Sequence, residues 1–73
     1  MLYADMLEAV RSRGLLDDAR AKVFQCRVDV WVVYDRLVDD YRLFVGPHWD
    51  YIIGEGRRYQ IIQVVRYKVK KKV

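Results

Sequence analysis

The residues of this sequence best suited to chemistry stand at its C-terminal end, where cations alternate with apolar residues. Within VVRYKVKKKV, the cations at every second position are Arg66, Lys68, Lys70 and Lys72. In a β-strand, residues two apart point to the same face and lie roughly 6.6–6.8 Å apart. Phosphates along a nucleic-acid strand are spaced on a similar scale, and each neutralised phosphate releases counterions. The pattern therefore predicts a cationic row that binds a phosphate backbone in a salt-dependent way.

Two further arginines, Arg57 and Arg58, follow the turn at Gly54–Gly56, at the start of the same predicted strand, and would extend this surface if they turn toward the same edge. Lysine outnumbers arginine in the row, and lysine contacts phosphate as a point charge rather than through a bidentate fork. We therefore expect nucleic-acid binding, to DNA or RNA, with little sequence preference. The alternatives are a solubilising tail, a lysine-rich edge that prevents aggregation, or another acidic partner.

The net charge of +4 is unevenly distributed along the chain. Residues 1–22 sum to zero, and residues 23–65 sum to −1. Residues 66–73 contribute five cations and no anion. Because the whole excess of positive charge lies at one end, the sequence favours a negatively charged partner for that end.

The scarce reactive residue types predict no catalytic site, no metal site and no cofactor. Cys26 is the only cysteine, which excludes a disulfide framework, and its place in an alternating apolar run predicts that it is buried. His48 is the only histidine and stands in a predicted turn, so a zinc site is not expected. Ser12 is the only serine, which leaves no Ser/His/Asp set. These residues favour a binding protein over an enzyme.

Hydrophobic periodicity predicts the elements that must position the cations. Residues 2–22 show the 3.6-residue period of one or two helices, interrupted at Gly14. From residue 23 the period changes to two, which indicates strands. The predicted strands cover residues 23–34, 41–45, 49–53 and 57–69. The expected fold is α+β, with one or two N-terminal helices packed on one face of a three- to four-stranded antiparallel sheet, open or curled, over residues 23–70, and a frayed basic end at 71–73.

The second face of this predicted sheet is too apolar for a solvated surface. It carries, on the first and last strands, Trp31, Val33, Ile62 and Val64. An apolar patch of this kind on a small protein usually marks a contact site. A second copy of the chain would cover it in a homodimer, a curled sheet would bury it in a barrel, or Trp31 would belong to a binding platform. Because a chain of 73 residues buries only a small core, we favour a homo-oligomer.

The composition predicts a single globular domain inside the cell. No apolar run approaches the ~20 residues of a membrane span, and the N-terminal stretch MLYADMLEAV lacks a basic region of the signal-peptide type. We therefore expect a cytoplasmic protein without a membrane partner. The chain has no Asn and no Thr and is rich in charged residues, which is typical of a thermophilic source.

The stretch YRLFVGPHWDYIIGEGRRYQIIQVVRYKVKKK, from Tyr41 to Lys72, resembles the C-terminal sheet of RelE-type toxins. That family shows a YRxRVG-like strand, a return strand, a turn and a closing strand that ends in basic residues. The resemblance implies a ribonuclease that cleaves mRNA on the ribosome, with functional residues Arg42, Arg66 and Lys68. It covers less than half of the chain. A nucleic-acid-binding protein is the leading hypothesis, and a RelE-like ribonuclease and a protein-interaction or assembly subunit are the alternatives.

Overall fold

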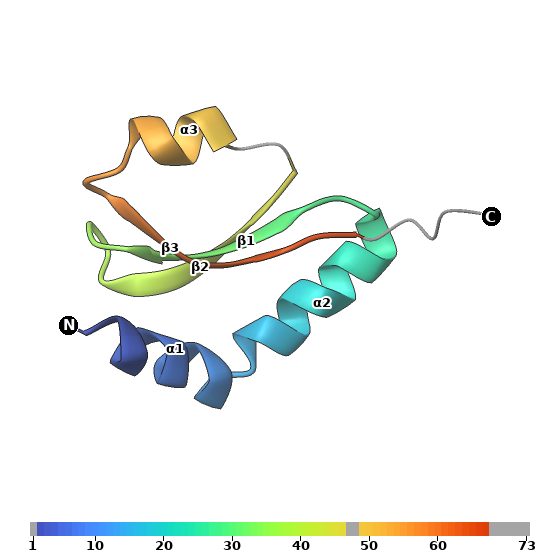
Figure 1. The fold of residues 1–73 in the computed structure, drawn as a ribbon, viewed down its shortest axis with the longest axis horizontal. Helices are drawn as coiled ribbons and strands as arrows, with labels where there is room; N and C mark the ends of the chain where they lie inside the picture. Colours follow the sequence, from blue (N-terminus) through green and yellow to red (C-terminus); the bar gives the residue numbers. More distant parts are fainter. Residues whose placement is uncertain (1, 47–48, 68–73) are drawn as a thin grey trace.

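The sheet of this protein lies between helices on both of its faces (Figure 1). The computed structural model describes residues 2–46 and 49–67. The helices are α1 (Tyr3–Ser12), α2 (Leu15–Cys26) and α3 (Trp49–Gly54), and the strands are β1 (Val30–Asp35), β2 (Asp40–Val45) and β3 (Tyr59–Val65). α1 and α2 cover one face, and α3 covers the other. The predicted α+β fold with an antiparallel sheet is confirmed, and the sheet is open rather than closed into a barrel.

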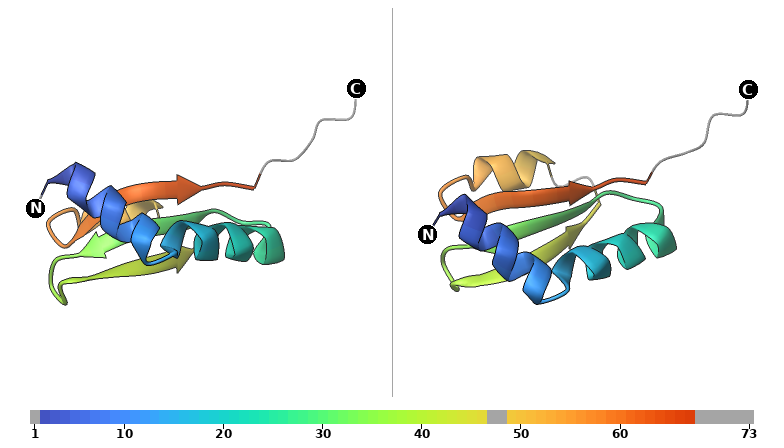
Figure 2. Two further views of the ribbon diagram at one scale, coloured as in Figure 1. Left: turned by 90° about the horizontal axis from the view of Figure 1, so that it is seen from below. Right: turned by 60° about the horizontal axis from the view of Figure 1, so that its bottom comes forward.

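β1 is the central strand in the order β2-β1-β3, and it pairs antiparallel with both neighbours (Figure 2). β2 and β3 therefore run parallel to each other on either side of β1. A tight turn cannot join two parallel strands, so the chain crosses over β1 through α3. β1 reads VWVVYD, an almost continuous apolar run, and five of its six residues are buried, as expected for a strand covered on both faces.

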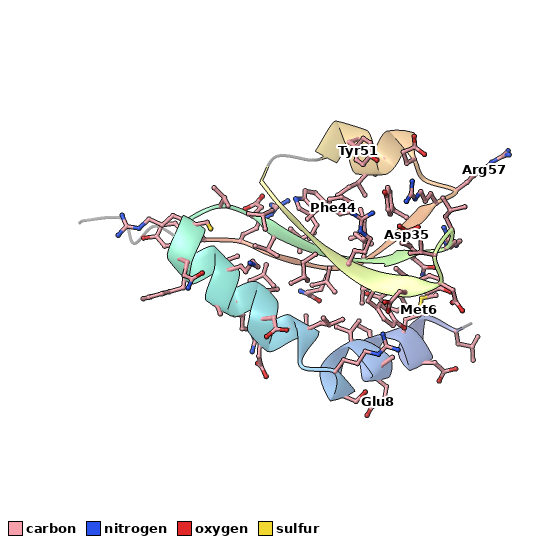
Figure 3. The ribbon with its side chains drawn as sticks, turned by 180° about the vertical axis from the view of Figure 1, so that it is seen from behind. Met6, Glu8, Asp35, Phe44, Tyr51 and Arg57 are labelled. Atoms are coloured by element: carbon pink, nitrogen blue, oxygen red, sulfur yellow. The ribbon has the colours of Figure 1, made fainter. Side chains whose placement is uncertain are left out.

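α1 and α2 cover their face of the sheet with apolar residues four apart. Met6 and Val10 of α1 are buried, and so are Ala19 and Val23 of α2. Residues four apart share one helix face, so each helix presents a single apolar stripe. Figure 3 shows Met6 directed toward the sheet and Glu8 directed away from it. The stripes pack against the sheet residues of this layer, Val30, Val32 and Ile62.

Two residues in the left-handed conformation bound α2. Gly14, with φ 72°, separates α1 from α2, which confirms the predicted interruption. Arg27, with φ 56°, ends the helix after Cys26. The helical region therefore extends to residue 26, and the prediction of a strand over residues 23–29 is wrong.

The reason for this error lies in Val23. It follows Ala19 by four residues, and the two are buried on the same face of α2. Burial of this helix face favours a helix more than the alternation of apolar residues from Val23 onward favours a strand. Two residues that this alternation placed on a buried sheet face are exposed instead. Phe24 is 82% exposed, and Cys26 is exposed rather than buried as predicted.

The predicted strand over residues 49–53 is a helix, α3. Ile52 is buried, whereas its neighbours Tyr51 and Ile53 are about half exposed. A short apolar run does not distinguish a strand from a helix by its period. The topology decides between them, because a connection between two parallel strands is usually helical. Within the described residues, the sheet therefore has three strands.

β3 is shorter than predicted and contains a β-bulge. It begins at Tyr59 and ends at Val65, and its register with β1 shifts between Val32 and Val33. Val32 pairs with Gln63 and Val33 pairs with Ile61, which leaves Ile62 without a partner of its own. A bulge of this kind reverses the inward and outward alternation beyond it. Ile62 therefore points toward α1 and α2, and the predicted alternation along this strand is wrong there.

Candidate functional site

A buried carboxylate marks the end of β1. Asp35 is fully buried and accepts hydrogen bonds from Arg58 through Nε (3.0 Å) and Nη2 (3.1 Å). Arg42 Nη1 lies 3.3 Å from the same carboxylate, and the backbone N–H of Leu37 donates to it at 3.1 Å. Hydrogen bonds from Arg58 lower the pKa of Asp35, and burial raises it. The hydrogen bonds have the larger effect, so the pKa lies below its usual range. The same pair raises the pKa of Arg58, so both groups are charged at neutral pH.

The register of the sheet brings these residues together from three segments. Asp35 is the last residue of β1 and stands opposite Asp40 of β2 and Tyr59 of β3. Arg58 immediately precedes β3, and Arg42 lies two residues into β2. The hydrogen bond from the N–H of Leu37 to the carboxylate of Asp35 forms an Asx turn, which starts the connection to β2. One carboxylate thus joins the ends of all three strands.

Aromatic rings form one side of this cluster. The guanidinium of Arg42 lies 4.9 Å from the ring centre of Phe44, and that of Arg58 lies 5.0 Å from the ring of Tyr59. Tyr51 of α3 brings its hydroxyl to 3.4 Å from the hydroxyl of Tyr59. That hydrogen bond is the main reason why the pKa of Tyr59 is raised. Figure 3 shows the side of the sheet where α3 places Tyr51 over this region.

Arg36 is held beside this cluster by neutral oxygen atoms. Its Nη1 donates to the carbonyl oxygens of Gly56 and Arg57, at 3.2 Å each, and its Nη2 donates to Oε1 of Gln60 at 2.8 Å. Within the described ranges, Arg36 forms no ion pair with a carboxylate. Its position is therefore fixed while its charge is not compensated.

A shallow hollow of about 680 Å³ opens between the β1–β2 connection and the α3–β3 connection. It is lined by Arg36, Leu37, Gly54, Glu55, Gly56, Arg57 and Arg58. Arg57 is exposed, and Figure 3 shows its side chain extending away from the body of the protein. The hollow thus combines arginines with one acidic residue and one exposed apolar side chain.

Of the residues predicted to bind nucleic acid, the three that the structure describes do not lie in one place. Arg57 and Arg58 precede β3, whereas Arg66 follows it, and a strand of seven residues spans about 20 Å. Arg58 is engaged by Asp35 through Nε and Nη2, so this carboxylate compensates part of its charge. Arg66 lies beyond the end of the strand, is exposed, and has its Nε 3.6 Å from Oδ2 of Asp29. The predictions for His48, Lys68, Lys70, Lys72 and residues 71–73 concern positions outside the described residues.

The four residues predicted as an oligomer interface do not form one exposed patch. Trp31 and Val33 are buried within a single chain, where Ile52 of α3 covers them and Val64 packs beside them. Trp31 Nε1 also donates to the carbonyl oxygen of Gly46 at 3.1 Å. Ile62 lies on the opposite face because of the bulge. The prediction is corrected on this point, because the chain itself supplies the cover that a second copy was expected to provide.

The resemblance to RelE-type toxins implied a return strand where the chain forms α3, so the implied order of strands is not present. Arg42 faces the carboxylate of Asp35, and Arg66 stands beyond β3. Comparison of the chain with protein-family models, with curated proteins and with solved structures finds no match. Over residues 2–46 and 49–67, the fold is an open three-stranded antiparallel sheet between two helical layers.

Sequence reasoning did not find the cluster around Asp35. The connection over residues 35–40, DRLVDD, reads as a charged and solvated turn. Only the position of Asp35, at the end of an apolar run, could have indicated a buried carboxylate. The described residues contain no group of three or more potential metal-ligating side chains and no helix long and apolar enough to cross a membrane.

Proposed function

We propose that this protein binds nucleic acid through the basic segment that follows β3, by contacts to phosphates with little sequence preference. The observation that supports the proposal is the separation of charge. Residues 2–67 contain ten cations and ten anions, so the net charge of +4 equals the four lysines that remain. These lysines are Lys68, Lys70, Lys71 and Lys72.

Within the described residues, carboxylates pair with several of the arginines. Asp40 pairs with Arg13 at 2.7 Å, Asp17 approaches Arg20 at 3.7 Å, and Asp35 engages two further arginines. No acidic residue follows Glu55 in the sequence, although seven cations do. The excess of cations over anions in the sequence therefore stands at the C-terminal end, where it can replace counterions on a phosphate backbone.

The experiment compares two variants of equal net charge. In the first, Lys68, Lys70, Lys71 and Lys72 are changed to Gln. In the matched control, four cations of α1, of α2 and of the residue that ends α2 are changed to Gln instead: Arg11, Arg20, Lys22 and Arg27. Both full-length variants have a formal net charge of zero, because each loses four positive charges from a net charge of +4. Fluorescence anisotropy with labelled DNA and RNA across a salt series measures the affinity.

The wild-type chain should bind with a log–log salt slope of about −3 to −4 on duplex DNA if all four lysines contact phosphates. The C-terminal variant should lose this binding, and the control should retain most of it. Equal losses in the two variants would show that only net charge matters. Unchanged binding in the C-terminal variant would overturn the proposal.

A further inference from the structure

We propose that the hollow lined by Arg36, Arg57 and Arg58 is a second, separate anion site that binds the phosphate group of a nucleotide. It lies at the start of β3, about 20 Å from the residues that follow the strand. This site differs from the one under the proposed function, because its lining residues precede β3 and the basic segment follows β3.

Two of the three arginines of this site, Arg36 and Arg58, are held in place before any ligand binds, whereas Arg57 extends into solvent. The guanidinium of Arg36 is fixed by three acceptors on the α3–β3 connection and β3. Arg58 is fixed by both oxygens of Asp35, which leaves its Nη1 unused by that pair. Ordering a long side chain costs conformational entropy, so a site in which two of the three arginines are already ordered binds an anion at a lower cost.

The residues around the hollow and the cluster around Asp35 carry more positive than negative charges. Four arginines stand around the cluster and the hollow, against the carboxylates of Asp35 and Glu55. Asp35 is shared by two of these arginines and is fully buried, so it cannot also compensate the other two. The local excess of positive charge is thus built into the fold, although the described residues taken together carry as many anions as cations.

The side chains and the size of the hollow suit a phosphorylated small molecule. Guanidinium groups match the geometry of phosphate oxygens through paired hydrogen bonds. The hollow, at about 680 Å³, is of the size that accepts a small organic molecule. Leu37 lines it and is 73% exposed, which offers an apolar surface to a sugar or a base. A nucleoside monophosphate fits this combination better than a bare inorganic anion does.

The test uses the full-length chain in which the four lysines at 68, 70, 71 and 72 are changed to Gln, so that the basic segment does not contribute. AMP and inorganic phosphate are titrated separately, and the side-chain Nε–H signals of the arginines are followed by NMR. Binding should shift the signals of Arg36, Arg57 and Arg58 in a saturable way. Circular dichroism checks that each variant stays folded.

Three substitutions in this background should change the affinity for AMP in different directions. Arg57→Gln removes an exposed charge and should weaken AMP binding about three- to fivefold. Glu55→Gln removes the opposing charge and should strengthen binding by a similar factor, about three- to fivefold. Arg11→Gln, on the exposed side of α1, should leave the affinity unchanged.

Tighter binding of AMP than of phosphate would support a nucleotide site with a contribution from Leu37. Equal affinities would support a site for the phosphate group alone. Absence of saturable shifts, or equal effects of Arg57→Gln and Arg11→Gln, would overturn the inference. These outcomes are independent of the nucleic-acid assay, because that assay measures the lysines that are absent from this background.

Discussion

The two ends of β3 hold arginine–aspartate pairs in opposite circumstances. At the start of the strand, Arg58 donates two hydrogen bonds to Asp35, whose side chain is completely buried. At the other end, Arg66 and Asp29 are 66% and 39% exposed, and their charged atoms lie 3.6 Å apart. The same two residue types therefore stabilise the fold at one end and remain open to solvent at the other. Burial and hydrogen-bond geometry, not residue type, make the difference.

The largest expected effect comes from breaking the buried pair. Asp35→Asn leaves Arg42 and Arg58 without a carboxylate and removes an acceptor from the buried site. The melting temperature should fall by roughly 10 °C or more. The matched variant Asp29→Asn, at the other end of β3, should change it by no more than a few degrees. Thermal unfolding followed by circular dichroism measures both, and equal shifts would contradict the comparison.

The next effect concerns the helix that covers the buried end. Ile52 of α3 is 1% exposed and packs on the same side of the sheet as Trp31 and Val33. Ile52→Ala should lower the free energy of unfolding by ~2 kcal/mol or more, because it leaves a cavity under α3. Its neighbour Ile53 is 52% exposed, so Ile53→Ala should cost less than ~0.5 kcal/mol. Urea unfolding of both variants gives the two values.

A smaller effect is expected from acid. The pKa of Asp35 is lower in the folded chain than in the unfolded one, so its ionised form stabilises the fold above the unfolded pKa of ~3.9. This stabilisation is lost as the pH falls through the folded pKa, and Asp40, whose pKa is lowered chiefly by the N–H of Tyr41, follows the same direction. Wild type should therefore lose stability steeply below about pH 4. In Asp35→Asn, melting curves from pH 7 to pH 2 should show a shallower loss.

The smallest expected effect on stability lies at the open end. Arg66→Gln removes an exposed pair and should change the free energy of unfolding by less than ~0.5 kcal/mol. If the basic segment binds nucleic acid, the same change should weaken that binding modestly and reduce the salt slope by about 1 at most. A loss of stability as large as that of Asp35→Asn would show that the two ends of β3 are equivalent.

Much of the fold was predictable because it rests on local periodicity. The stripe that contains Met6 and Val10, the interruption at Gly14, and the apolar run of β1 all follow from residues close together in the chain. The errors arose where distant contacts decide the outcome. Trp31 seemed exposed because nothing in the sequence shows that α3 returns over it. Ile62 was assigned to the wrong face because one unpaired residue reverses an alternation.

The sequence by itself determined the composition of the layers and the placement of net charge. The helical stripes, the apolar central strand and the excess of four lysines are properties of short segments, which periodicity and charge reveal directly. Only the tertiary structure decided that residues 49–54 form a helix over β1, that β3 bulges at Ile62, and that Asp35 joins three strand ends. The physical reason is that burial and ion pairing depend on neighbours in space, and here those neighbours lie 7 to 23 residues away in the chain.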